Sequence, residues 1–187
     1  MTGKSLALVE VLKLRSTVLG VQAFWIGTFA LLTAIGAQIE IPHQPVPYTL
    51  QTFFVLLAGA LLGARRGFMS MSLYLLVGLL GLPVFSGAGF GLARILGPTG
   101  GYLLAFPLAA LVIGFITNRR GSFVWIVTGM LAGLMLIFTL GTLQLKLVSG
   151  MDWGSAIQSG FLIFSWWDVL KLSAAATIAH QFLKRTP

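Results

Sequence analysis

An all-α, polytopic membrane helical bundle with six transmembrane helices is the fold class that the sequence predicts. Among the 187 residues, 57% are hydrophobic and 9% are charged, whereas a domain that folds in water carries about 25% charged residues. The apolar residues form long segments, and most Lys and Arg residues lie between those segments. One domain per about 100 to 200 residues is typical, so we expect residues 1–187 to form a single membrane domain.

Six apolar segments account for the predicted spans, because a helix that crosses a bilayer needs about 20 mostly apolar residues. Taken in chain order, they cover approximately residues 18–39, 49–64, 67–85, 98–118, 123–147 and 164–183. The second segment is short for a full crossing. Residues 155–167 contain polar positions and end in two tryptophans, which is typical of a short interfacial or re-entrant helix rather than a seventh span.

Nine basic residues indicate the orientation of the bundle, because cytoplasmic loops carry an excess of Lys and Arg. They lie before the first span and after the second, fourth and sixth spans: Lys4, Lys13, Arg15, Arg65, Arg66, Arg119, Arg120, Lys184 and Arg185. These four sites fall on one side of a six-helix protein. We therefore expect a multi-pass protein of the cytoplasmic (cell) membrane with both termini in the cytoplasm.

Several function classes are excluded by composition. The net charge of +8 does not indicate nucleic-acid binding, because the basic residues punctuate apolar spans instead of lining one face. The chain has no cysteine, and His43 and His180 fall on opposite sides of the predicted membrane, so no metal cluster or His-centred triad is expected. We predict no catalytic residue, no metal and no cofactor. The sequence also lacks an ATPase motif, so energy for pumping would come from partners or a gradient.

Six further charges map to the outer half of the bundle, where orientation does not require them: Glu40, Arg94, Lys146, Asp152, Asp168 and Lys171. Charges near hydrocarbon are costly unless they are paired or hydrated. Asp168 and Lys171 are three residues apart, so they share a helix face and can form a simple intrahelical pair. If Arg94 joins them, the cluster sums to +1, and a monocarboxylate would neutralise it.

Two outer loops add polar groups and unusual backbone. Residues 40–51 contain three prolines, which fix an extended backbone, and Thr49 and Gln51 follow at the start of an apolar helix. Helix capping by Thr49 is the alternative explanation. Between the third and fourth spans, Gly87, Gly89 and Gly91 alternate and allow a ligand to approach the backbone closely. A phosphate-binding loop is excluded there, because no strand precedes it and no Lys-Ser/Thr pair follows.

One helix face is built from small residues. Ala30 and Ala34 are four residues apart in the first span and form a small-xxx-small pattern, which favours close contact between helices. The pattern serves equally well for an internal neighbour or for a separate membrane partner.

Taken together, the motifs resemble the BioY family, the biotin-specific substrate-binding (S) components of energy-coupling factor (ECF) transporters. The resemblance runs from the first span to Asp168 and Lys171 of the sixth, and it is strongest at residues 45–51, at residues 61–63 followed by Arg65, and at residues 81–85 and 97–102. It implies the S-component fold, with high-affinity capture of biotin from outside the cell. It further implies docking on an ECF transmembrane coupling subunit that carries a pair of cytoplasmic ATPases, where ATP is hydrolysed.

The resemblance also implies roles for individual residues. It places Arg94, Asp168 and Lys171 at the polar ends of biotin, and it places further residues in contact with biotin or over it: Thr49, Gln51, Gly87, Gly89 and, as a weaker candidate, Tyr102. Ala30 and Ala34 correspond to the family's docking surface. The chain departs from the family pattern at Trp166–Trp167, where Pro-Gly is usual, and at Gly87–Phe90, where paired glycines are usual; Phe90 is expected to line the pocket.

Three other functions are alternatives to biotin binding. An S component for another vitamin, such as riboflavin or thiamine, is the nearest alternative, although a net positive cluster disfavours cationic thiamine. A membrane enzyme acting on lipid would need nucleophiles or metal ligands that the sequence lacks. A structural membrane subunit would have no need for Arg94 and Lys171 in the outer half.

Overall fold

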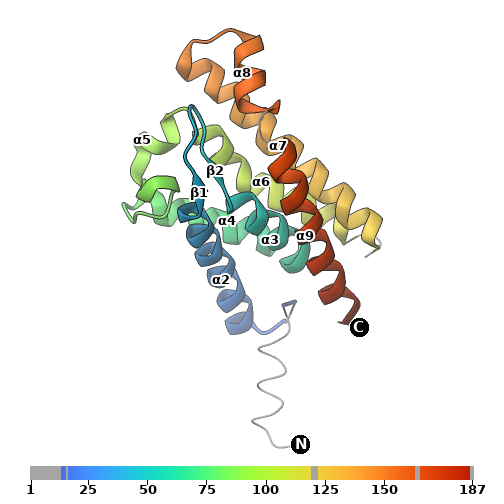
Figure 1. The fold of residues 1–187 in the computed structure, drawn as a ribbon. Helices are drawn as coiled ribbons and strands as arrows, with labels where there is room; N and C mark the ends of the chain where they lie inside the picture. The colour runs from blue at the N-terminus through green and yellow to red at the C-terminus, as the bar shows by residue number, and fades with distance from the viewer. Residues whose placement is uncertain (1–13, 16, 119–121, 163–164, 186–187) are drawn as a thin grey trace, which may run out of the picture.

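The computed structural model describes residues 14–15, 17–118, 122–162 and 165–185. It consists of helices and one short two-stranded ribbon (Figure 1). In chain order the elements are α2 (Leu19–Gln38), β1 (Glu40–Ile41), β2 (Tyr48–Thr49), α3 (Gln51–Leu62), α4 (Ala64–Leu79), the 3-10 turn η1 (Ser86–Ala88), α5 (Gly91–Leu96), α6 (Gly100–Thr117), α7 (Phe123–Ser149), α8 (Trp153–Gly160) and α9 (Ser165–Arg185).

Helices α2, α6 and α7 are long and apolar enough to cross a membrane, and α3 is a shorter apolar helix. The outward faces of the long helices carry large apolar side chains, such as Leu31, Phe115 and Met135, which are 62%, 57% and 49% exposed. Such surfaces are stable against lipid, where backbone groups must be satisfied within helices. The molecule is therefore built as a membrane protein.

The second and third helices are shorter and closer together than the predicted segments 49–64 and 67–85. Helix α3 ends at Leu62 and α4 begins at Ala64, because Gly63 adopts φ +82°, a conformation that other residues rarely adopt. Helix α4 ends at Leu79, well before residue 85. Pro83 explains this end, because a proline ring clashes with the helical carbonyl four residues earlier.

Helix α6 packs tightly against the α3–α4 turn in the centre of the bundle. A Cβ atom at Gly114 would lie 2.1 Å from the Ala64 nitrogen, and one at Gly59 would lie 2.8 Å from the Ala110 oxygen. Ile113 and Met71 are completely buried between these helices. Only residues without a side chain allow backbones to come this close, so the core forms a rigid support for the outer ends of α3 and α6.

The small-residue face of α2 belongs to this interior. Ala30 is 7% exposed and lies in the core, and Ala34 is partly buried against it. A hydrogen bond of 2.7 Å from the Ser70 hydroxyl to the Ile26 carbonyl ties α4 to the same helix. Internal neighbours therefore cover most of Ala30, whereas Ala34 is only partly covered, and the docking surface expected at Ala30 and Ala34 stays a prediction.

The two ends of the bundle differ in content (Figure 1). The β1–β2 ribbon, α5 and α8 gather at one end, and the beginning of α2 and the end of α9 lie at the other. In the ribbon, Glu40 pairs with Thr49 and Ile41 pairs with Tyr48. Helix α8 replaces the predicted interfacial segment 155–167, and it begins at Trp153 because the Asp152 side chain accepts a hydrogen bond from the Ser155 amide.

Arg15 does more than contribute positive charge near the first span. Its Nε donates to the Leu61 carbonyl at 3.0 Å and its Nη2 donates to the Ala60 carbonyl at 2.8 Å. These carbonyls belong to the last turn of α3, where the helix leaves them without internal partners. Burial, with a smaller contribution from Arg66, lowers the pKa of Arg15. Four other topological residues lie outside the described residues: Lys4, Lys13, Arg119 and Arg120.

Candidate functional site

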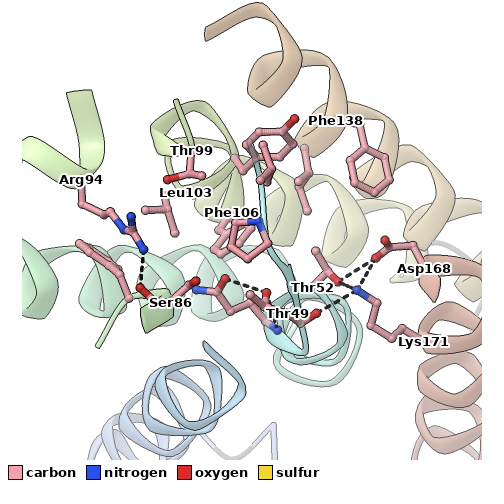
Figure 2. A pocket seen from close by; sticks show the side chains of 16 residues that line it. Thr49, Thr52, Ser86, Arg94, Thr99, Leu103, Phe106, Phe138, Asp168 and Lys171 are labelled. Atoms are coloured by element: carbon pink, nitrogen blue, oxygen red, sulfur yellow. Dashed lines mark hydrogen bonds and ion pairs between the residues drawn. The ribbon is translucent and has the colours of Figure 1, made fainter. Parts of the chain in front are cut away.

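A cavity lies at the end of the bundle that carries the ribbon and α5. It is lined by the loop before α3 and by residues of α3, η1, α5, α6, α7 and α9, and a concave, mostly apolar site with a few polar groups is typical of small-molecule binding. The middle of the wall is apolar and is formed by residues such as Leu103, Phe106 and Phe138. Charged side chains lie at two separate places, with Arg94 on one side and Asp168 and Lys171 on the other (Figure 2).

Asp168 and Lys171 form the first polar pole of the cavity. The Lys171 ammonium lies 2.7 Å from the Asp168 Oδ1 atom and donates to the Thr49 carbonyl at 3.0 Å and to the Thr52 hydroxyl at 2.6 Å. The Thr52 hydroxyl in turn donates to Asp168 Oδ1 at 2.8 Å. This arrangement is more than an intrahelical pair, because it joins α9 to the start of α3.

The second carboxylate oxygen of Asp168 is not used in these contacts. Asp168 is only 2% exposed, and its Oδ2 atom is buried without a hydrogen-bond partner among the residues that the structure describes. Buried carboxylate oxygens are normally satisfied, because leaving them unpaired costs free energy. A donor group on a bound molecule in the cavity would satisfy this oxygen.

Arg94 forms the second pole, from the last turn of α5. Its Nη2 donates to the Ser86 carbonyl at 2.5 Å. Helix α5 is fixed from the other side by Gln144, whose Nε2 donates to the Ile95 and Gly97 carbonyls at 2.7 and 2.8 Å. The expected convergence of Arg94 with Asp168 and Lys171 on one carboxylate is corrected here, because the guanidinium and the ion pair face each other across the cavity (Figure 2).

Thr49 and Gln51 line the cavity between the poles. The Thr49 hydroxyl donates to the Gln51 carbonyl oxygen at 2.9 Å, and the Gln51 amide donates to the Tyr74 hydroxyl at 2.5 Å. The Tyr74 hydroxyl in turn donates to the Val84 carbonyl at 3.1 Å. This network orders the start of α3 against the loop that follows α4. Tyr102 also lines the cavity, and its hydroxyl donates to the Gly160 carbonyl at the end of α8 at 2.8 Å.

Three predicted contacts are not part of the lining. Phe90 is 58% exposed and precedes α5, so the expectation that it lines the pocket is wrong. Gly87 and Gly89 also lie outside the lining. Both belong to the loop beside the Arg94 side chain. A Cβ atom at Gly89 would come within 2.7 Å of Arg94 Nε, so this glycine leaves room for the guanidinium.

Several lining residues could not be singled out from the sequence. Thr52 and Thr99 are ordinary polar residues in apolar surroundings, and Phe106 and Phe138 resemble the other aromatic residues of the spans. The position of Thr52 beside Gln51 is the one available signal. Its bond to Asp168 bridges 116 positions in the chain, a distance that local patterns do not report.

A helical membrane bundle with a largely apolar cavity and two opposed charged poles is the architecture of a membrane solute-binding protein. The chain belongs to the BioY family, whose family profile matches residues 10–187.

Named relatives and a solved structure agree with this assignment. The chain is 43% identical over 158 residues to the biotin transporter BioY of Thermotoga maritima, covering 84% of this chain and 93% of that protein. It is 41% identical over 161 residues to the probable biotin transporter BioY of Pyrococcus horikoshii, covering 86% and 95%. The crystal structure of the S-component for biotin from an ECF-type ABC transporter superposes with a TM-score of 0.81 at 25% identity, covering 99% and 95%.

Proposed function

We propose that this chain is the substrate-specific component of an ECF-type transporter and that it binds biotin with high affinity for uptake across the cytoplasmic membrane. Its relatives are named as biotin transporters, and the matched structure is an S-component for biotin. The protein acts as a transport component and not as an enzyme. ATP hydrolysis is assigned to partner subunits, and no cofactor is required by this chain.

The observation that carries the proposal is the match between the two poles of the cavity and the two polar ends of biotin. Biotin has a ureido ring with two N–H donors and one carbonyl acceptor, a hydrocarbon and thioether body, and a terminal carboxylate. Asp168 Oδ2 is a buried acceptor without a described partner, which suits a ureido N–H. Lys171 and Thr52 lie beside it and suit the ureido carbonyl.

Arg94 then receives the carboxylate at the opposite pole. Asp168 and Lys171 balance each other's charge across 2.7 Å, so Arg94 supplies the positive charge that a monocarboxylate neutralises. A guanidinium binds a carboxylate through charge-assisted hydrogen bonds. The apolar wall between the poles, with Phe106 and Phe138, suits the body of the molecule. A cationic solute would meet Arg94 unfavourably, which argues against thiamine.

The proposed topology has six crossings, made by α2, α3, α4, α6, α7 and α9, within one domain of residues 1–187. Helix α3 has 12 residues and α4 has 16, and these lengths are acceptable because α3 is almost entirely buried in protein. Arg15 precedes α2, Arg65 lies in the first turn of α4 and Lys184 lies in the last turn of α9. The beginning of α2 and the end of α9 lie at the end of the bundle away from the ribbon (Figure 1). By the positive-inside rule this end faces the cytoplasm, together with both termini.

The proposed partners are an ECF transmembrane coupling subunit and a pair of cytoplasmic ATPases, in addition to membrane lipid. The supporting observation is the likeness to a component of an ECF-type ABC transporter. Docking at Ala30 and Ala34 stays part of the proposal, with Ala34 the more exposed of the two.

Titration of the purified protein with biotin in detergent tests the proposal. We expect saturable binding of one biotin per chain and a rise in melting temperature, because a ligand that binds only the folded state stabilises it. Lipoate, a monocarboxylate without a ureido ring, is the matched control and should bind much more weakly. No heat of binding and no thermal shift at micromolar biotin would refute the proposed function.

A further inference from the structure

Glu40 is an outer charge that the binding site does not use directly. It begins strand β1, immediately after α2, and it does not line the cavity between the two poles. One of its carboxylate oxygens accepts a short hydrogen bond from the Ser86 hydroxyl. The other lies beside Gly87: a Cβ atom built there would be 3.7 Å from Glu40 Oε1 and 3.6 Å from Arg94 Nη2. Glu40 and Arg94 thus approach the same loop.

The loop between them holds an unusual backbone. Gly87 and Ala88 have φ values of +64° and +53°, and a residue with a Cβ such as Ala88 rarely adopts this region. Such conformations persist only where the surroundings fix them. Gln38, from the last turn of α2, fixes this one: its amide donates to the Phe85 carbonyl at 3.1 Å, and its oxygen accepts from the Ala88 amide at 3.2 Å.

Ser86 connects the loop that Gln38 holds to the side chain of Arg94. Its hydroxyl donates to Glu40, while its carbonyl accepts the 2.5 Å hydrogen bond from Arg94 Nη2. A continuous series of contacts therefore runs from the end of α2, through residues 85–89, to the guanidinium. Arg94 has a long side chain whose direction has to be fixed before binding, and this series supplies the fixed acceptor.

We propose that Glu40 and Gln38 are positioning residues for biotin binding. They hold residues 85–89 in the conformation that aims Arg94 at the substrate carboxylate, and they do so without touching the substrate. This inference rests on the proposed function and on the role of Arg94 within it. Glu40 acts as a hydrogen-bond acceptor for the Ser86 hydroxyl, and it affects binding of the ligand only through Arg94.

The test compares biotin with biotin methyl ester, which keeps the ureido ring and lacks the negative charge. Glu40→Ala should weaken biotin roughly tenfold, the size expected when a hydrogen bond to a charged group is lost, and should change ester affinity by less than about threefold. Glu40→Gln keeps an acceptor for Ser86 and should restore most of the biotin affinity. Gln38→Ala should show the same preference for biotin over the ester.

A double-mutant cycle separates positioning from general loss of structure. In an Arg94→Ala background, Glu40→Ala should have no further effect on biotin, because residues that act through one another are not additive. Asp152→Ala, at an exposed acidic residue of the same end, is the control and should leave both affinities unchanged. The melting temperature of each ligand-free variant checks that the protein is folded.

The outcomes are distinguishable. Equal weakening of biotin and its ester by Glu40→Ala, or additive effects in the Arg94→Ala background, would overturn the positioning role. Absence of biotin binding by the unaltered protein would instead refute the proposed function. Equal loss of both ligands in Arg94→Ala alone would refute the assignment of the carboxylate to Arg94, and the positioning role would fall with it.

Discussion

The hydroxyl of Thr52 donates a hydrogen bond of 2.8 Å to the Oδ1 atom of Asp168, across 116 positions of the chain. This bond joins the first turn of α3 to the first turn of α9, and Lys171 reinforces it by contacting both partners. Because Oδ1 is committed to these contacts, Oδ2, which has no hydrogen-bond partner among the described residues, is left available for a donor group of the ligand. The two oxygens of Asp168 thus have different roles at one pole of the cavity, and Arg94 forms the opposite pole.

Arg94→Met and Lys171→Met should differ in which ligand they weaken. Arg94→Met should reduce biotin affinity by about tenfold or more and should hardly change the affinity for biotin methyl ester, because only the carboxylate meets the guanidinium. Lys171→Met should weaken both ligands equally, because it acts at the ureido pole. Calorimetric titration of each variant with each ligand measures this. The reverse pattern would show that biotin binds in the opposite orientation, with its carboxylate at Lys171.

Asp168→Asn should abolish tight binding and also destabilise the folded protein. The substitution leaves the Lys171 ammonium, whose side chain is only 11% exposed, without its counter-charge. Removing one partner of a buried pair costs about 3–5 kcal/mol of stability, and biotin affinity should fall by about 10- to 100-fold because the ureido N–H loses a charged hydrogen-bond acceptor. The melting temperature without ligand should fall as well. Asp152→Asn is the control, because that carboxylate is exposed; equal effects of the two substitutions would contradict the assignment.

Gly89→Ala should weaken biotin by displacing Arg94. The new Cβ atom would lie 2.7 Å from Arg94 Nε and 3.1 Å from the Ser86 carbonyl oxygen, so the guanidinium would have to move. Binding of the methyl ester should be largely retained. Gly27→Ala is the matched control, because a Cβ there meets nothing within 4 Å and alanine favours a helix by about 1 kcal/mol over glycine. Unchanged biotin affinity in Gly89→Ala would show that the guanidinium is not held against this loop.

Hydropathy was sufficient to place the main helices, because their lipid-facing sides are apolar over long stretches. The motif resemblance also singled out both poles of the site, at Arg94 and at Asp168 with Lys171. The opposition of these poles was not predictable, since it depends on how α5 and α9 pack around the cavity. The error at Phe90 has a related cause: the position of a residue in a loop does not tell which way its side chain points, and Phe90 turns outward.

Two features of helix packing were also not predictable from the sequence. The small residues Ala30 and Ala34 favoured close packing in general, and only the fold shows that Ala30 packs inward against the core. Nothing in the sequence accounts for Gln144 near the end of apolar helix α7, yet its side chain donates to the carbonyls that end α5. Polar groups inside such helices are costly without a partner. The partner, however, lies on another element and is revealed only by tertiary structure.

Helix α8 should lose its N-terminal cap only in acid. Asp152 accepts hydrogen bonds from the Ser155 hydroxyl and amide at 2.6 and 3.0 Å, and these bonds lower the pKa of its carboxyl. A depressed folded pKa means that the stabilisation is present above the ordinary carboxyl value of about 3.9 and is lost as the pH falls through the lower folded value. Amide hydrogen exchange in the first turn of α8 should therefore be protected at pH 5 to 8. Asp152→Ala should remove this protection throughout that range, and continued protection in the variant would argue against the cap.

Arg15 should stabilise the bundle by capping α3, independently of its contribution to membrane orientation. Arg15→Lys keeps the positive charge that the positive-inside rule requires, but one ammonium cannot reproduce the two guanidinium bonds to Ala60 and Leu61. We expect a loss of about 1–2 kcal/mol in stability, seen as a lower melting temperature, with the relative affinities for biotin and its methyl ester unchanged. Arg65→Lys, at the exposed start of α4, should leave the melting temperature unchanged. If both substitutions lower it equally, the effect belongs to basic residues at this boundary in general and not to the cap of α3.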